Sequence, residues 1–119
     1  MSKYFITTPI YYINDKPHIG HAYSTIAADV LARWHRHNGD QVLFTTGTDE
    51  NSQKTVDAAK KSGQDEKVYT ESMSKLWQAT WDQMGISYNR FVRTTEPDHK
   101  KAVYELIKRA EASGDIYKG

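Results

Sequence analysis

The feature that most constrains the fold is one long helical pattern with a short apolar run on each side. Apolar residues recur with helical spacing over residues 19–34, and Asn38-Gly39 then provides a strong C-terminal stop. Residues 4–8 form a short aromatic and β-branched run, and residues 42–44 form a short apolar run. The first 45 residues therefore predict a strand, a helix and a second strand.

This order predicts an α/β fold with parallel strands and flanking helices. We expect the first strand to end at Pro9 and the second strand to be buried on both faces. Parallel strands joined by a helix cross over right-handedly, so the loops after their carboxyl ends lie at one edge of the sheet. Residues 9–18 and 47–52 should therefore meet at that edge.

The rest of the chain predicts packing helices and one weak strand. Helical spacing runs through residues 56–60 and 69–84, with Trp77 and Trp81 on one face, and residues 88–93 read as a weak strand. These helices are expected to pack on the sheet, and the two tryptophans are expected to lie in the core.

A last helix is expected to begin near Pro97, with the Thr95 hydroxyl as its cap. Its inward face would consist of Val103, Leu106, Ile107 and Ala110. Residues 115–119 resemble the start of another strand and then stop without a polar tail. From this pattern we expect the 119 residues to be a piece of something longer.

Composition excludes some classes of protein. Sixteen basic against 15 acidic residues give a net charge of +1, so nucleic-acid binding cannot be argued from overall charge. The chain has no cysteine, which rules out disulfides and Cys-ligated zinc within it. It has neither a signal-peptide pattern nor a long apolar stretch, so we expect a cytoplasmic protein without a membrane segment.

The strongest candidate site is His18-Ile19-Gly20-His21, between the first strand and the long helix. A helix N-terminus offers free N–H groups and a positive dipole end, which attract phosphate. Two imidazoles add donors that would stabilise charge on a reacting phosphate, and Gly20 would let a nucleotide lie against the backbone. His18, Gly20 and His21 are therefore predicted to form a nucleotide-phosphate site.

Other interpretations of these histidines exist. A single histidine near a helix start is usually a surface residue or a cap, and His-x-x-His can be part of a metal site, because residues i and i+3 share a face. The sequence places no third metal ligand nearby, so no metal site is predicted.

The same residues carry a resemblance to class I aminoacyl-tRNA synthetases, and to the methionine-specific family in particular. His-Ile-Gly-His is the signature of the class, and related nucleotidylyltransferases share a shortened form. Thr7-Thr8-Pro9, Gly47-Thr48-Asp49-Glu50, Arg93-Thr94-Thr95-Glu96 and Gly114-Asp115-Ile116-Tyr117 extend the likeness along the chain. The motif stretch consists of Tyr11, Tyr12, Ile13, Asn14, Asp15, Lys16, Pro17, His18, Ile19, Gly20 and His21.

The resemblance implies a methionine site. Ile10 and Tyr12 match positions of the methionine pocket, and Asp49 matches the carboxylate that holds the substrate α-ammonium. An apolar and aromatic lining suits a thioether, and an ammonium needs an opposite charge. The alternatives are that Asp49 caps a turn and that Tyr12 only packs. The family commonly has His-Gly where this chain has Asn51-Ser52, so the role of those residues does not transfer; both can cap the next helix.

The implied activity is ligation of methionine to tRNA(Met) through methionyl-adenylate, with ATP and Mg²⁺ as the substrate complex. The resemblance implies that His18, Gly20 and His21 bind ATP and that His18 and His21 are catalytic. Residues 1–119 would be the first half of a Rossmann-like catalytic domain. The connective insertion, where zinc is often bound, the second signature Lys-Met-Ser-Lys-Ser and the anticodon-binding domain would follow. Three alternatives stay open: a synthetase for another amino acid, a nucleotidylyltransferase, and a non-catalytic fragment that binds RNA or a protein partner. The oligomeric state cannot be inferred.

Overall fold

The computed structural model describes residues 1–119 as a parallel sheet of three strands with four helices. The strands lie in the order β1-β2-β3, and both strand pairs are parallel. The elements in chain order are β1 (Lys3–Tyr12), α1 (Ile19–His37), β2 (Gln41–Asp49), α2 (Gln53–Lys61), α3 (Glu66–Gln83), β3 (Arg90–Arg93) and α4 (Pro97–Ala112). The α/β class expected from the sequence is confirmed.

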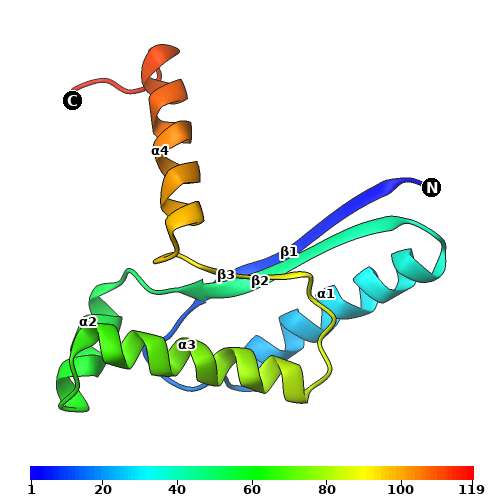
Figure 1. Cartoon of the computed structure of the whole chain (residues 1–119), viewed down its shortest axis with the longest axis horizontal. Helices are drawn as coiled ribbons and strands as arrows, with labels where there is room; N and C mark the ends of the chain where they lie inside the picture. The colour runs from blue at the N-terminus through cyan, green and yellow to red at the C-terminus, as the bar shows by residue number, and fades with distance from the viewer.

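The order of the strands explains where the helices lie. Each crossover moves one strand further in the same direction, and right-handed crossovers that all move one way place their helices on the same face. In Figure 1, α1 and α3 lie on one side of the sheet, whereas α4 extends away from it on the other side. None of the helices is long and apolar enough to cross a membrane.

The core lies between the sheet and the helices α1 and α3. Trp77, Trp81, Phe44 and Ile13 are completely buried there. The indole N–H of Trp77 donates to the Asp15 carbonyl at 3.0 Å, which ties α3 to the segment between β1 and α1. The prediction that both tryptophans belong to the core is confirmed.

The boundaries of α1 agree with the sequence. Asn38 is its C-cap, and Gly39 has a φ of +84°, a left-handed conformation that glycine adopts without a Cβ penalty. At the other end of β2, the Ser52 hydroxyl accepts a hydrogen bond from the Thr55 N–H at 3.2 Å, so Ser52 caps α2 as expected.

Two expectations about the strands were wrong. β1 continues through Pro9 to Tyr12, with a shift of register between Thr7 and Ile10. A proline lacks the N–H that a ladder requires, and such an irregularity in an edge strand accommodates it. β2 is not buried on both faces: Leu43 is 49% exposed, because the helices cover only one face of the sheet.

The expectations about the C-terminal part also need correction. α4 has no buried residue, and Val103, Leu106, Ile107 and Ala110 do not form an inward face, because the helix extends away from the sheet. Its N-cap is Glu96, which makes no side-chain cap bond, whereas the Thr95 hydroxyl donates to Glu50 instead. Residues 115–119 form no strand.

Candidate functional site

The histidine turn is held by two reciprocal hydrogen bonds at the start of α1. His18 is the N-cap, and its Nδ1 accepts from the Gly20 N–H at 3.1 Å. In return, His21 Nδ1 accepts from the His18 N–H at 3.1 Å. This is a capping box built from two imidazoles, and it satisfies two backbone donors that the helix leaves unpaired.

These bonds determine which nitrogens remain for chemistry. A neutral imidazole whose Nδ1 accepts a hydrogen bond carries its proton on Nε2. The rings of His18 and His21 stack with centroids 3.6 Å apart and an interplanar angle of 27°. The turn therefore presents two Nε2–H donors at a helix N-terminus, an arrangement suited to phosphate oxygens. Because both Nδ1 atoms are engaged, the pair cannot chelate a metal through them.

The side chain of His21 is held by aromatic contacts from two elements. Its ring meets the Tyr11 ring edge-on at 4.9 Å and the Trp77 ring edge-on at 4.7 Å. Burial, followed by the repulsion that His18 exerts when its ring is protonated, lowers the pKa of His21. A lowered pKa favours the neutral ring, which is the form that can accept at Nδ1 and donate at Nε2.

Gly20 is required by the cap itself. A Cβ at this position would lie 2.9 Å from His18 Cε1 and 3.1 Å from His18 Nδ1. Any larger residue would push the ring away from the Gly20 N–H that it accepts from. The absence of a side chain thus serves the position of His18, in addition to the access for a nucleotide expected from the sequence.

One hollow brings four of the predicted residues together. A hollow of about 360 Å³ at the end of β1 is lined by Ile10, Tyr12, His18 and His21, together with their neighbours Tyr11, Asn14, Asp15 and Lys16. Ile10 and Tyr12 are two residues apart on β1, so their side chains point to the same face of the sheet. They lie on a strand rather than on the loop where the sequence placed them.

Asp49 reaches the same edge of the sheet from β2. Tyr12 pairs with Asp49 and Ile10 pairs with Gly47 across the parallel ladder, so the two segments meet as expected. Asp49 lines a second, neighbouring hollow of about 700 Å³ that shares Ile10 with the first. One oxygen of Asp49 accepts from the Asn51 N–H at 3.1 Å. Asp49 therefore also caps the turn after β2, which was the alternative interpretation of this residue.

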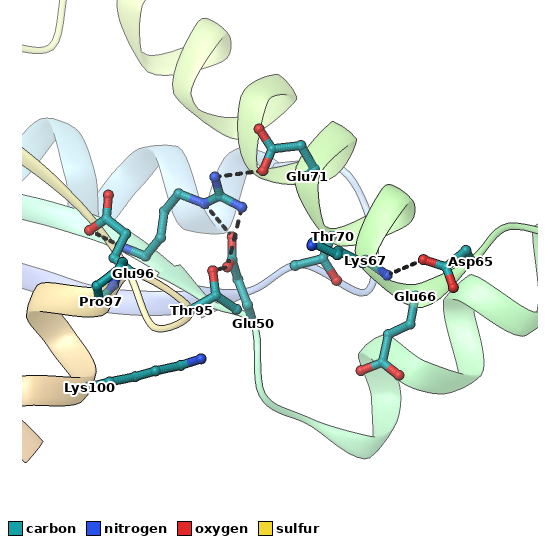
Figure 2. A pocket seen from close by; sticks show the side chains of 11 residues that line it. Glu50, Asp65, Glu66, Lys67, Thr70, Glu71, Thr95, Glu96, Pro97 and Lys100 are labelled. Carbon is teal, nitrogen blue, oxygen red and sulfur yellow. Dashed lines mark hydrogen bonds and ion pairs between the residues drawn. The ribbon is translucent and has the colours of Figure 1, made fainter. Parts of the chain in front are cut away.

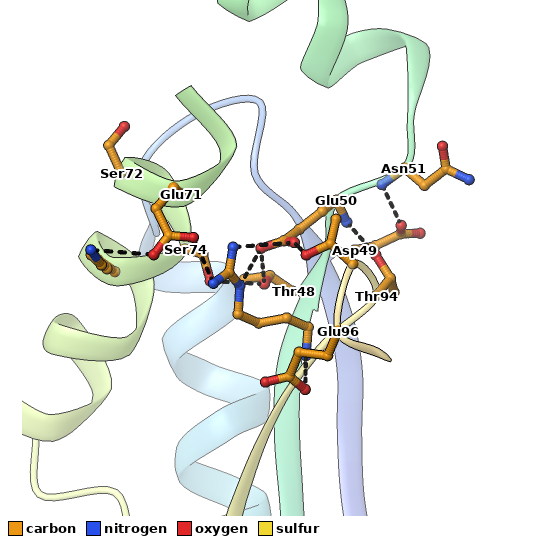
Figure 3. Close-up of polar contacts among 12 residues, drawn as sticks. Thr48, Asp49, Glu50, Asn51, Glu71, Ser72, Ser74, Thr94 and Glu96 are labelled. Carbon is orange, nitrogen blue, oxygen red and sulfur yellow. Dashed lines mark hydrogen bonds and ion pairs between the residues drawn. The ribbon is translucent and has the colours of Figure 1, made fainter. Parts of the chain in front are cut away.

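A buried charge network next to Asp49 was missed by the sequence analysis. The Glu50 side chain is fully buried and contacts Arg93, with 2.8 Å between Oε1 and Nε. Arg93 Nη1 contacts Glu71 Oε2 on α3, also at 2.8 Å. Figure 3 shows these contacts around the end of β2. The network joins three segments that are distant in the sequence. No spacing of residues in the sequence indicates that these side chains meet.

The network also forms one wall of a third hollow, drawn in Figure 2, between α3 and the start of α4. It measures about 720 Å³ and has no hydrophobic residue in its lining. In this view Lys100 of α4 and Glu66 of α3 lie on opposite sides, with Glu50 and Thr95 between them. It adjoins the Asp49 hollow, with which it shares Glu50, Glu66, Thr95 and Lys100.

Comparison with known proteins shows the family of the chain. The family model described as tRNA synthetases class I (M) matches residues 4–119. The chain belongs to this family. It is 44% identical to the methionine–tRNA ligase of Thermotoga maritima over 98% of its own length, and 49% identical to that of Thermosynechococcus vestitus over its whole length.

A solved structure is also similar to nearly the whole of this chain. The Mycobacterium tuberculosis methionyl-tRNA synthetase in complex with methionyl-adenylate superposes on 98% of this chain with a TM-score of 0.95 and 43% identity. The chain covers 23% of that structure, and 19% and 23% of the two curated relatives. It therefore spans about a fifth of the length of the proteins it matches.

Proposed function

We propose that this chain carries the phosphate-binding half of a site that activates methionine with ATP. The observation that carries the proposal is the pair of Nε2–H donors that the capping box of His18 and His21 presents at the N-terminus of α1. Donors fixed in advance at such a point stabilise charge that develops in a transition state without having to reorganise.

In the proposed reaction, the methionine carboxylate attacks the α-phosphate of ATP. A bond forms between the carboxylate oxygen and phosphorus, the bond to the bridging oxygen breaks, and pyrophosphate leaves. His18 and His21 hold the negative charge on the phosphate oxygens, and Gly20 leaves the helix start open to the nucleotide. Mg²⁺ enters as part of the MgATP substrate. A terminal hydroxyl of tRNA(Met) then takes the methionyl group and AMP leaves.

Methionine would lie beside the histidine turn on the same edge of the sheet. Ile10 and Tyr12 supply an apolar and aromatic surface, and Asp49 supplies a carboxylate for the α-ammonium group. The exposed fractions of Ile10 and Tyr12, 38% and 50%, leave side-chain surface for a substrate to cover. The carboxyl ends of parallel strands are where α/β sheets bind ligands.

The names of the relatives support the proposed substrate. The curated relatives are named methionine–tRNA ligase, and the similar solved structure holds methionyl-adenylate. The chain covers about a fifth of each, and we propose that residues 1–119 are the N-terminal part of the catalytic domain. The rest of the site, including the second signature, would lie in the part of the relatives that this chain does not match.

The test is exchange of labelled pyrophosphate into ATP by the native gene product. We expect exchange that depends on methionine and is absent with leucine or isoleucine. His21→Ala should lower the rate of adenylate formation more than the affinity for methionine, because the donor acts on the transition state. Exchange that ignores methionine, or that prefers another amino acid, would overturn the proposal.

A further inference from the structure

A carboxylate that the proposed reaction does not use is buried directly beside the proposed ammonium ligand. Glu50 follows Asp49 in the chain, and its side chain is 0% exposed. Removing a carboxylate from water costs several kcal/mol unless partners compensate. Replacing such a pair with apolar side chains is often neutral or stabilising, so stability alone does not explain its presence.

The partners of Glu50 hold it in one orientation. Oε1 and Oε2 lie 2.8 and 3.5 Å from Nε and Nη2 of Arg93, so the guanidinium contacts both carboxylate oxygens. The Thr95 hydroxyl donates to Oε2, and the Glu50 N–H donates to the Thr94 hydroxyl at 2.8 Å. Both the side chain and the backbone of Glu50 are therefore attached to the segment that follows β3.

The opposite side of Arg93 is attached to α3. Nη1 of Arg93 contacts Glu71 Oε2 at 2.8 Å. Burial lowers the Arg93 pKa, but the hydrogen bonds to Glu50 and Glu71 together with their negative charges outweigh it and raise that pKa. One permanently charged guanidinium thus joins the end of β2 to α3. Figure 3 shows Glu50 directed toward Glu71 and Ser74 of α3, whereas the Asp49 carboxylate lies on the other side near Asn51.

This arrangement determines where Asp49 can point. Successive residues at the end of a strand point to opposite faces, so fixing Glu50 against α3 directs Asp49 to the face that carries Ile10 and Tyr12. Asp49 itself has only the Asn51 N–H as a hydrogen-bond partner. We propose that Glu50, held by Arg93, is a positioning residue for methionine binding that aims the Asp49 carboxylate at the substrate ammonium.

This inference rests on the proposed function, and steady-state kinetics of the native gene product test it. We expect Glu50→Gln to raise the KM for methionine roughly tenfold with kcat and the KM for ATP little changed, because a misaimed ligand weakens ground-state binding. Arg93→Gln should raise the KM for methionine more, since this substitution leaves the buried Glu50 carboxylate unpaired. The double variant Glu50→Gln/Arg93→Gln should have a KM for methionine closer to the wild-type value than that of Arg93→Gln, because two amides can pair without charge.

A matched control separates positioning from stability. Asp29 of α1 is a carboxylate in a similar network, with Arg33 Nε at 2.7 Å and the Ser87 N–H at 2.7 Å. Asp29→Asn should lower the melting temperature and leave the KM for methionine unchanged. If Glu50→Gln and Arg93→Gln also lower the melting temperature and leave the KM for methionine unchanged, the network is merely structural and the inference is wrong.

Asp49→Asn distinguishes failure of the inference from failure of the proposed function. An unchanged KM for methionine in Asp49→Asn would overturn the proposed role of Asp49, and with it the positioning of that residue by Glu50. A raised KM in Asp49→Asn together with unchanged values in both network variants would overturn the inference alone. Raised values in all three, with partial recovery in the double variant, support both.

Discussion

At the scale of single residues, each imidazole of the histidine turn divides its two nitrogens between structure and chemistry. Nδ1 of His18 and of His21 caps the backbone of α1, and the Nε2–H groups remain free for a ligand. A motif that sequence analysis treats as a set of phosphate donors is therefore also a helix cap. Because of this double use, a substitution at either histidine changes the helix cap as well as the set of donors.

Two substitutions at His21 separate these uses. The amide nitrogen of glutamine can reach the place of Nε2, and an asparagine side chain can reach only the place of Nδ1. We expect His21→Gln to keep adenylate formation within about tenfold of the wild-type rate, and His21→Asn to lower it about a hundredfold, a typical effect of removing one transition-state donor. Single-turnover formation of the adenylate measures both. A faster Asn than Gln variant would show that the cap, and not the Nε2 donor, matters for the rate.

A clamp formed by Asp40, His35 and Ser2 holds the amino end of β1. Asp40 accepts from His35 at 2.8 Å and from the Ser2 hydroxyl at 2.5 Å, and these bonds, with that of His35 the largest, lower the pKa of Asp40 to about 2. A depressed carboxyl pKa contributes stability above the ordinary value of about 3.9 and loses it as the pH falls through the folded value. The clamp should therefore weaken between about pH 4 and pH 2.

Hydrogen exchange of residues 3–8 in the native gene product checks this prediction. At pH 5, Asp40→Asn should exchange faster than wild type in this segment. Near pH 2 the two should converge, because the wild-type protein has then lost most of the stability that the charged Asp40 carboxylate contributes. Asp57→Asn, on the surface of α2, should behave like wild type at each pH. Equal exchange at pH 5 in wild type and Asp40→Asn would contradict the role of the clamp.

At the scale of elements, the close approach of β2 and β3 depends on Gly47. A Cβ on Gly47 would overlap the Val92 carbonyl oxygen, which belongs to backbone and cannot rotate away. Gly47 also pairs with Ile10 of β1, so it lies at the point where all three strands meet. The sequence showed only a glycine near the end of a strand, and the reason for it lies in a strand more than 40 residues away.

Substitution of Gly47 should therefore separate β3 from the sheet. We expect Gly47→Ala to lower the free energy of unfolding by on the order of 3 kcal/mol, because the overlap must be relieved by backbone movement. Gly63→Ala is the matched control: its φ of +68° disfavours alanine, but nothing lies near its Cβ, so about 1 kcal/mol is expected. Denaturant titration of the native gene product measures both. Equal losses would show that β2 and β3 have room to adjust.

The irregular element is β1, where proline misled the interpretation of the sequence. Pro9 is a strong stop signal within a single strand, and the shift of register beside it allows pairing to resume at Ile10. As a result Ile10 and Tyr12 lie on a rigid strand paired with β2, next to Asp49. A pattern read along one chain cannot show that a neighbouring strand keeps pairing after the irregularity.

At the scale of the whole molecule, the sheet has one covered and one open face. The chain has a radius of gyration of 16.8 Å, whereas a compact domain of this length has about 13.5 Å. Large apolar side chains remain exposed on the sheet, on α1 and on α4; they include Phe5, Leu43, Tyr23, Val30, Trp34, Tyr104 and Leu106. Exposed apolar surface of this extent is typical of an interface and not of an isolated monomer.

The isolated 119 residues should therefore behave poorly in solution. We expect them to bind the apolar dye ANS and to self-associate at micromolar concentration, because water contacts apolar groups that a larger domain would cover. Fluorescence titration and sedimentation velocity measure these properties, with a full-length relative such as the methionine–tRNA ligase of Thermotoga maritima as the control. A monodisperse segment that does not bind the dye would contradict this expectation.

By itself, the sequence determined the local elements and the chemical character of the site. Periodicity, Asn38-Gly39 and the alternation of strand and helix predicted α1 and the parallel sheet, because these depend on interactions between neighbours in the chain. The histidine turn was found from residue type and position, whereas Asp49 was identified through the resemblance to the family. Their proposed roles in binding ATP and methionine stay predictions.

Only the tertiary structure decided which groups constrain that site. The Glu50–Arg93–Glu71 network, the overlap that excludes a side chain at Gly47, and the open face that leaves α4 exposed all depend on segments distant in sequence. Burial and pairing are properties of the assembled sheet, because a charge is costly or favourable only according to what surrounds it. For this reason the histidine turn could be found in the sequence, whereas the residues proposed to aim its partner Asp49 could not.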